Sequence, residues 1–158
     1  MQLIVREADA SDLEYAWSLY QPFIVQHIFP RRSQFQVSTA DEWSAAEGIK
    51  FPESIKSTEV YIILVDDARV GWCNIVKINN RIVIQNIFID EEWKSKGIAQ
   101  RLFDEMIPQW KSEKRVVEVP VLLGTPYSDL IAGALEAIGF TAAEEDGLVR
   151  SMIANWSK

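Results

Sequence analysis

The chain has almost none of the side chains that most often carry nucleophilic or metal chemistry. Its 158 residues include a single cysteine, Cys73, and a single histidine, His27. One cysteine excludes an internal disulfide and fits a reducing, cytoplasmic setting. We predict no metal site from this composition.

Long apolar runs are also missing. The longest, Val60–Val65, is far shorter than the roughly 20 residues that a membrane-spanning helix needs. Arg6 and Glu7 follow the first residues so closely that no secretory apolar segment fits before them. No repeat, low-complexity tract or linker interrupts the chain. We therefore expect one domain over residues 1–158, with no membrane partner.

Positive charge is in short supply. The formal net charge is -7 with 25% charged and 48% hydrophobic residues, which is ordinary for a globular protein. Nucleic-acid binding usually requires a basic face, so nucleic acid is not expected as a partner. An acidic surface instead favours cationic molecules such as amines.

Two phosphate-binding motifs are absent as well. The sequence contains neither G-x-G-x-x-G nor G-x-x-x-x-G-K-[ST], so neither dinucleotide nor P-loop chemistry has its usual scaffold. A generic phosphate-binding α/β domain is accordingly a less favoured interpretation.

The most informative segment that is present is residues 82–106. It reads as an apolar strand, a charged turn and an amphipathic helix that begins near Gly97. Lys94 and Lys96 lie in the turn, where the positive end of the helix dipole disfavours cations by roughly 0.3–1 kcal/mol each. Lysines, free amides and the small residues Gly97 and Ala99 together suit a bound anion such as pyrophosphate. The same residues also fit an ordinary turn with solvated lysines, and the pattern alone leaves both interpretations open.

Periodicity and turn residues predict a mixed α/β protein. The expected order is β-α-α-β-β-β-α-β-α-β-β, with helices at about 11–20, from Thr39 to Gly48, at 97–111 and at 127–138. Pro22 is expected to interrupt the first helix, leaving only a loose helix over 23–28, and Pro52 to close the second.

The segment Lys94-Ser95-Lys96-Gly97-Ile98-Ala99 resembles the Arg/Gln-x-x-Gly-x-Gly/Ala signature of the GCN5-related N-acetyltransferases (GNAT family). The run Ile89–Trp93 is similar to the residues that precede that signature, and Arg6-x-Ala8-x-x-x-Asp12 and Gly139-Phe140 look like the family's beginning and end. The resemblance implies a GNAT-like mixed central β-sheet flanked by helices, with acetyl-CoA as co-substrate.

The resemblance also implies where acetyl-CoA would bind. Its pyrophosphate would lie over the amides from Lys96 to Gln100, next to Lys94, and its pantetheine arm would pair with the strand at Ile87, Phe88 and Ile89. A primary amine of a small molecule or peptide would attack the thioester directly, without a covalent enzyme intermediate. A homodimer is one assembly that the sequence leaves open.

Proton transfer is where the sequence departs from the family pattern. The position of the family's glutamate base is Gln85, and the tyrosine and asparagine positions of its later motif are Leu135 and Ser128. Glutamine cannot accept a proton at neutral pH and leucine cannot donate one. These departures favour an alternative, in which the chain is a catalytically weak acyl-CoA-binding module with a sensing or scaffolding role.

Several residues remain candidates for catalysis. Gln85 with Asn86 could orient a water that carries the proton outward, Tyr127 could replace the missing tyrosine, and Glu118 is a candidate base. His27 lies in the substrate-facing region but among apolar residues, which favours a structural role. Cys73 is expected to pack in the core. A carboxylate in place of Gln85 is expected to be partly buried, with a raised pKa.

Overall fold

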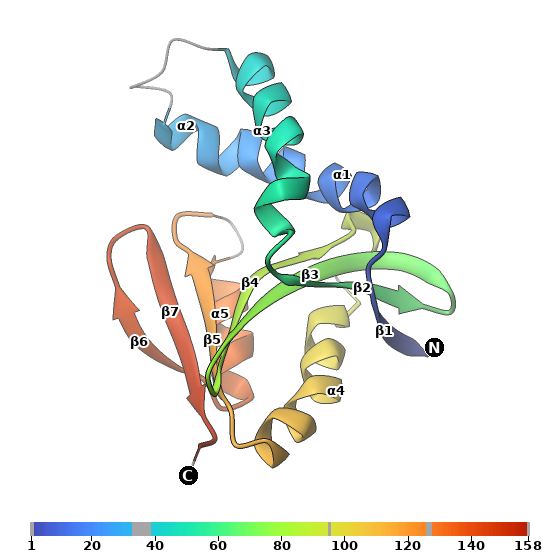
Figure 1. The fold of residues 1–158 in the computed structure, drawn as a ribbon. Coiled ribbons are helices and arrows are strands. Elements are labelled where there is room, and N and C mark those ends of the chain that lie inside the picture. The colour runs from blue at the N-terminus through green and yellow to red at the C-terminus, as the bar shows by residue number, and fades with distance from the viewer. Residues whose placement is uncertain (1, 33–38, 95, 126–127, 158) are drawn as a thin grey trace.

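Seven strands form one mixed sheet in the computed structural model, which describes residues 2–32, 39–94, 96–125 and 128–157 (Figure 1). The strand order is β1-β2-β3-β4-β5-β7-β6. Adjacent strands are antiparallel except β4 and β5, which run parallel. The strands are β1 (Leu3–Glu7), β2 (Glu59–Val65), β3 (Ala68–Ile78), β4 (Arg81–Ile89), β5 (Val116–Leu122), β6 (Thr141–Glu145) and β7 (Val149–Asn155).

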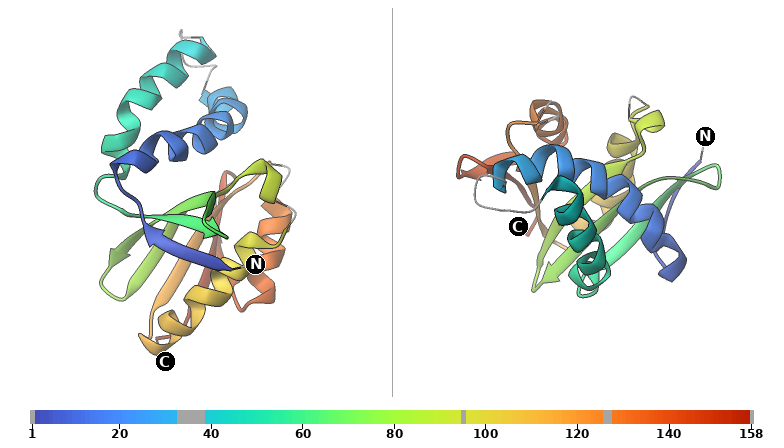
Figure 2. Two further views of the ribbon diagram at one scale, coloured as in Figure 1. Left: turned by 90° about the vertical axis from the view of Figure 1, so that its right-hand side faces the viewer. Right: turned by 90° about the horizontal axis from the view of Figure 1, so that it is seen from above.

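Helices cover both faces of this sheet (Figure 2). One face carries the N-terminal helices and the other carries α4 and α5, so the predicted mixed sheet flanked by helices is confirmed. The helical elements are η1 (Ala10–Asp12), α1 (Leu13–Phe23), η2 (Ile24–Ile28), α2 (Phe29–Arg32), α3 (Ala40–Ile55), η4 (Glu91–Trp93), α4 (Ile98–Ser112) and α5 (Ser128–Ala137).

Apolar clusters lie on both faces of the sheet. On the α4 and α5 side, Leu102, Phe103 and Trp110 of α4 pack onto the sheet, because apolar residues recur along one side of the helix. Phe140, after the helix-ending Gly139, is buried in the cluster that contains Phe103 and Trp110. On the opposite face Trp72 of β3 is buried under α1 and α3.

The expectation that Pro22 interrupts the first helix is wrong. Pro22 lies inside α1, and the helical path continues through the π-helical turn η2 into α2. A π-turn widens the hydrogen-bond ladder, which is a common way to accommodate a local break in it. Tyr20, on the preceding turn, packs edge-on against Trp72 of the sheet, so continuing the helix buries apolar surface that a break would expose.

The expected end of the second helix near Gly48 is also wrong. Helix α3 runs to Ile55 and includes Pro52. Phe51 and Ile55 are buried beneath this last part, so tertiary packing outweighs the proline. Gly48 serves close packing here, because a Cβ at that position would lie 3.0 Å from Cζ2 of Trp17.

Candidate functional site

The chain leaves β4 and enters α4 through a left-handed glycine. Gly97 has φ 71° and ψ 24° and stands at the N-cap of α4. It has no side chain to cap the helix, and the first turn contains no acidic residue. The amide of Arg101 bonds the Gly97 carbonyl over 3.1 Å, whereas the amides of Ile98, Ala99 and Gln100 belong to the helix end that has no intrahelical acceptor. This end of α4 can therefore donate several hydrogen bonds to an anion.

The two lysines of the turn have neighbours that the sequence pattern does not reveal. Lys94 Nζ lies 2.8 Å from Oε2 of Glu91, and Lys96 Nζ lies 4.6 Å from the centre of the Trp93 ring. Glu91 thus partly neutralises Lys94, while Lys96 is held by an aromatic face that leaves its charge intact. Of the two, Lys96 is the better placed to attract a phosphate.

Strand β4 separates from β5 directly before this turn. The two strands pair only from Arg81 to Val83, opposite Val116 to Glu118. Beyond Val83, β3 is the one strand among the described residues that pairs with β4, with Ile87, Phe88 and Ile89 opposite Cys73, Trp72 and Gly71. The β5-facing edge of these residues therefore offers main-chain groups that an extended ligand could pair with. Gly71 allows the close approach of the two strands, because a Cβ there would lie 2.4 Å from the Phe88 oxygen.

A bulge in β4 accompanies this separation. Asn74 pairs with Asn86 and Ile75 pairs with Ile84, so Gln85 is an extra residue on β4. The fully buried Asn74 donates from Nδ2 to Gln85 Oε1 over 3.2 Å and to Thr58 Oγ1 over 3.3 Å, and accepts from Asn86 Nδ2 over 2.9 Å. Asn74 was missed from the sequence because only the register reveals that it faces the bulge.

Gln85 itself is exposed, which contradicts the expectation that a carboxylate at this position would be partly buried. Gln85 and its neighbour Asn86 both contact Asn74 at the bulge, and the Gln85 side chain still reaches solvent. Glu118 of β5 lies half-buried and accepts from Nη1 of Arg81 over 3.3 Å. That ion pair holds the Glu118 carboxylate away from other partners. Tyr127 lies outside the described residues.

The other residues considered for chemistry serve packing. Cys73 is buried, and burial raises the pKa of its thiol to about 12, so a thiolate nucleophile is not available. Leu135 is buried in the cluster under α5, and the Ser128 hydroxyl donates to the Thr125 carbonyl over 3.0 Å. His27 of η2 contacts the ring of Phe23, with 5.3 Å between ring centres. No group of three or more His, Cys, Asp or Glu residues that could hold a metal occurs in the described part of the chain.

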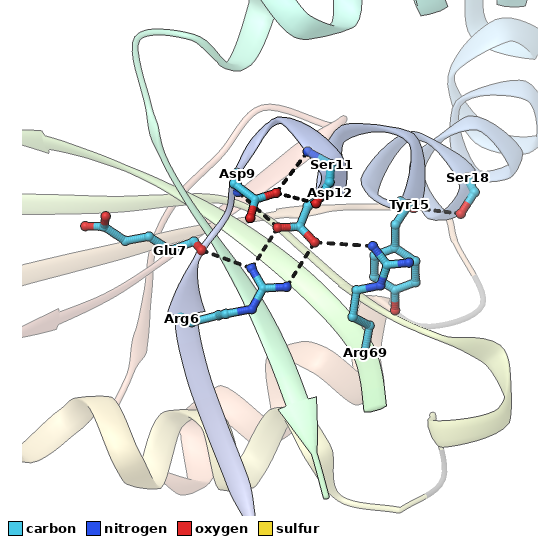
Figure 3. Close-up of polar contacts among 8 residues, drawn as sticks. All are labelled: Arg6, Glu7, Asp9, Ser11, Asp12, Tyr15, Ser18 and Arg69. Carbon is cyan, nitrogen blue, oxygen red and sulfur yellow. Dashed lines mark hydrogen bonds and ion pairs between the residues drawn. The ribbon is translucent and has the colours of Figure 1, made fainter. Parts of the chain in front are cut away.

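An ion network holds α1 against the sheet (Figure 3). Asp12, with 1% of its surface exposed, accepts from Arg6 at 2.7 and 3.0 Å and from Arg69 at 3.2 Å. It also accepts the Asp9 amide over 2.9 Å as part of a capping box. The hydrogen bonds from Arg6 hold the pKa of the Asp12 carboxyl well below its usual range, although burial acts in the opposite direction.

The same network reaches toward the β4–α4 turn. The Arg69 guanidinium stacks 4.5 Å above the ring of Tyr15. Burial, and then the charge of Asp90, raise the pKa of the Tyr15 hydroxyl to about 12. Asp90 is the N-cap of η4, so its influence on Tyr15 places this part of α1 near the beginning of the β4–α4 turn.

Comparison with known proteins agrees with this geometry. Residues 15–132 match the family described as "Acetyltransferase (GNAT) family", and the chain belongs to that family. Acetyl-CoA is the co-substrate of the family, which confirms the predicted co-substrate at that level. A search of the curated proteins gives no match.

Solved structures show the same fold at low sequence identity. PaiA N-acetyltransferase from Thermoplasma acidophilum, in complex with coenzyme A, has 14% identity and a TM-score of 0.67, covering 98% of this chain and 99% of its own. The ribosomal-protein-S18-alanine N-acetyltransferase from Escherichia coli has 12% identity and a TM-score of 0.62, covering 99% and 96%. YncA from Salmonella typhimurium, solved with its cofactor acetyl-CoA, has 11% identity and a TM-score of 0.60, covering 98% and 94%.

Among the helices described, none is long and apolar enough to cross a membrane.

Proposed function

We propose that this protein transfers the acetyl group of acetyl-CoA to a primary amine of a small molecule or peptide. The observation that carries the proposal is the uncapped start of α4 at Gly97, which follows the β4 edge not paired with β5 after the short turn η4. In a chain of the GNAT family, this combination offers both a pyrophosphate site and a main-chain site for an extended pantetheine.

The binding residues follow from that placement. Of the expected amides from Lys96 to Gln100, that of Lys96 already donates to the Trp93 carbonyl over 3.1 Å. The remaining amides, from Gly97 to Gln100, would receive the pyrophosphate, with the side chains of Lys96 and the Glu91-paired Lys94 beside it. Main-chain groups of Ile87, Phe88 and Ile89 would pair with the pantetheine arm. Two of the related structures contain coenzyme A or acetyl-CoA, which supports this proposal.

The chemistry proposed is direct attack of the amine nitrogen on the thioester carbon. A new C–N bond forms, the C–S bond breaks, and the CoA thiolate leaves with the electron pair. A primary ammonium ion with a pKa near ~10 must lose a proton first, whereas a thiol with a pKa near ~8.5 leaves tolerably as a thiolate. The proton acceptor is therefore the more important missing group.

We propose that the exposed Gln85 and the neighbouring Asn86 orient a water that removes this proton. Asn74 fixes both side chains at the bulge, which supports the proposal. Glu118 and Tyr127 remain candidates, the first limited by its ion pair with Arg81.

The alternative is a catalytically weak acyl-CoA-binding module with a sensing or scaffolding role. The observation in its favour is that Leu135, at the family's tyrosine position, is fully buried and apolar. Measuring CoA release from acetyl-CoA with a panel of amines separates the two functions. Turnover supports the transferase, and tight CoA binding in calorimetry without turnover supports the binding module.

Three further expectations remain proposals. They are a cytoplasmic location, inferred from the single cysteine, a homodimeric assembly, and a single N-acetyltransferase-like domain over residues 1–158. Nucleic acid is not proposed as a partner, because the net charge is -7.

A further inference from the structure

Arg31, at the end of α2, has no carboxylate partner within the described residues. It extends from α2, and its Nη2 donates to the carbonyl of Leu123, directly after β5. Its Nη1 is buried, and no atom of the described residues accepts a hydrogen bond from it. A Cβ on Gly124 would lie 2.7 Å from Nη2, so the backbone there is bare enough for the guanidinium to approach closely.

A guanidinium in this state is incomplete. It has five N–H donors in a planar fork and stays charged at every working pH. Buried charges in folded proteins are normally paired, and a buried donor without an acceptor costs free energy. The described part of the chain supplies Arg31 with one carbonyl oxygen only, although the protein as a whole is acidic. A carboxylate is the group that best matches the free part of the fork.

The position of Arg31 relates it to the proposed acetyl-transfer site. Phe23 contacts Phe88 of β4, with 5.3 Å between ring centres, and His27 contacts Phe23 at the same separation. Arg31 follows His27 by four residues, about one helical turn, and Phe23 by roughly 12 Å along the helical path. The helices therefore lead from the pantetheine strand to Arg31, which bridges to the end of β5.

We propose that Arg31 binds a carboxylate of the acceptor, so that the acceptor is an amine that also bears a carboxylate group, such as an amino acid or short peptide. This inference rests on the proposed function, because it places the acceptor's amine at the β4 edge and its carboxylate at Arg31. Arg31 contributes specificity and takes no part in the transfer of the acetyl group.

The test uses matched ligands that differ only in charge. Glycine, glycylglycine and triglycine, each paired with its C-terminal amide, are titrated into the protein–CoA complex by calorimetry. Triglycine spans up to about 10 Å when extended, so the series samples the separation between the two sites. The carboxylate of the best length should bind about tenfold or more tightly than its amide, as expected for charged hydrogen bonds.

Three variants assign that preference. Arg31→Gln should abolish it, and Arg31→Lys should restore only part, because an ammonium lacks the planar fork. Arg150→Gln is the control, because Arg150 of β7 is also half-buried but is already paired with Glu145 over 3.3 Å. This control should keep the full preference. The affinity for CoA should be the same in all three variants, which shows that the fold and the cofactor site are intact.

The outcomes separate this inference from the proposed function. Equal affinity for carboxylates and amides in the native protein overturns the role of Arg31. An equal loss of affinity for both ligands in Arg31→Gln also overturns it, because Arg31 would then only tie α2 to β5. No binding of either ligand class to a complex that forms normally with CoA also overturns it. Failure to bind CoA, in contrast, contradicts the proposed function. If the protein turns over, the preference for each carboxylate over its amide should also appear as a ratio of kcat/KM values for the acceptor.

Discussion

The side-chain amide of Asn74 donates to Oε1 of Gln85 over 3.2 Å at the point where β4 has one residue more than β3. The same nitrogen reaches Thr58, and the oxygen of Asn74 accepts from Asn86. Since the pairing of β4 with β5 ends two residues before Gln85, this buried amide fixes the strand where the sheet opens. Asn74 therefore links the opening of the sheet to Gln85 and Asn86, the side chains proposed to orient the water.

Replacing Asn74 by alanine should therefore impair both stability and acetyl transfer. Loss of three hydrogen bonds in a buried position should lower the free energy of unfolding by about 1–3 kcal/mol. KM for acetyl-CoA should rise, because the β4 edge is no longer held in place, and this is read from steady-state kinetics. Thr58→Val is the matched control, since it removes one acceptor of Asn74 and leaves both contacts to the bulge. If Asn74→Ala loses stability but keeps native kinetics, the cluster has a structural role only.

A carboxylate at position 97 should abolish CoA binding. Gly97→Glu would place negative charge beside the amides of the α4 start, where the pyrophosphate is proposed to lie. The positive φ of Gly97 means that any side chain adds strain, although no atom of the described residues lies within 4 Å of a Cβ there.

Gly97→Ala separates strain from charge in this experiment, because it carries the same backbone penalty without the carboxylate. Calorimetry should show weakened CoA binding in Gly97→Ala and none in Gly97→Glu, with circular dichroism unchanged in both. A folded Gly97→Glu protein with native affinity for CoA would place the phosphates elsewhere.

Lys94 and Lys96 should contribute unequally to the attraction of CoA. Because Glu91 already neutralises part of the Lys94 charge, Lys96→Gln should weaken CoA binding more than Lys94→Gln. The double substitution should flatten the dependence of affinity on salt, since screening acts on exposed charges. Affinities measured at several salt concentrations give both results.

Removing the carboxylate that opposes Lys94 should have the reverse effect. Glu91→Gln should tighten CoA binding by a few-fold, in line with the roughly 0.3–1 kcal/mol of a charge near a helix end. Glu92→Gln changes the net charge equally and lacks the ion pair to Lys94, so it should have a smaller effect. Equal affinity in Glu91→Gln and Glu92→Gln would mean that only the general charge of the turn matters.

Asp12 should make stability depend on pH in acid. Because its pKa is held below that of an unfolded aspartate, near ~3.9, its contribution is complete above that pH and is lost as pH falls through the lower, folded value. Asp12→Asn keeps an oxygen for the capping contact and removes the charge. It should cost about 2 kcal/mol near pH 7, less than the roughly 3–5 kcal/mol of a fully buried pair, because both arginines reach solvent.

Urea unfolding of native protein and Asp12→Asn across pH tests this. The difference between the two should be constant above about pH 5 and should shrink as the pH falls below 4. A difference that stays constant down to pH 2 would show that the network stabilises through shape and not through charge.

The sequence predicted the segments whose signal is local. The strand, turn and helix of residues 82–106 were predictable because apolar periodicity and the glycine at the helix start are read from neighbouring residues. The paths through Pro22 and Pro52 were not, because burial of Tyr20, Phe51 and Ile55 against distant strands outweighs the local preference of proline.

In the candidate site, too, local features could be predicted from the sequence and contacts between distant residues could not. The residues of the β4–α4 turn could be named from the sequence, although the pairing of Lys94 with Glu91 could not. Asn74 and Arg31 were missed, because their partners at Gln85 and Leu123 are distant in sequence and depend on the register of the sheet and the position of α2. The exposure of Gln85 was missed for the same reason, since a bulge is not visible in an apolar pattern.

Gln85→Glu should accelerate acetyl transfer if the missing proton acceptor limits the native protein. The substitution is nearly isosteric and places a carboxylate at the bulge, where Asn74 donates to the side-chain oxygen. Exposure and that hydrogen bond both favour the ionised form, so the group is ready to accept a proton at neutral pH. General-base assistance is typically worth ~10²–10⁴ in rate.

The gain in rate of Gln85→Glu should disappear as the pH falls through the glutamate pKa, near ~4.3 when unperturbed. Gln85→Ala, which removes the amide without adding a base, should be slower than the native protein if Gln85 orients a water. Glu118 would instead be the working base if the native protein is already fast and if both Gln85→Glu and Glu118→Gln slow it.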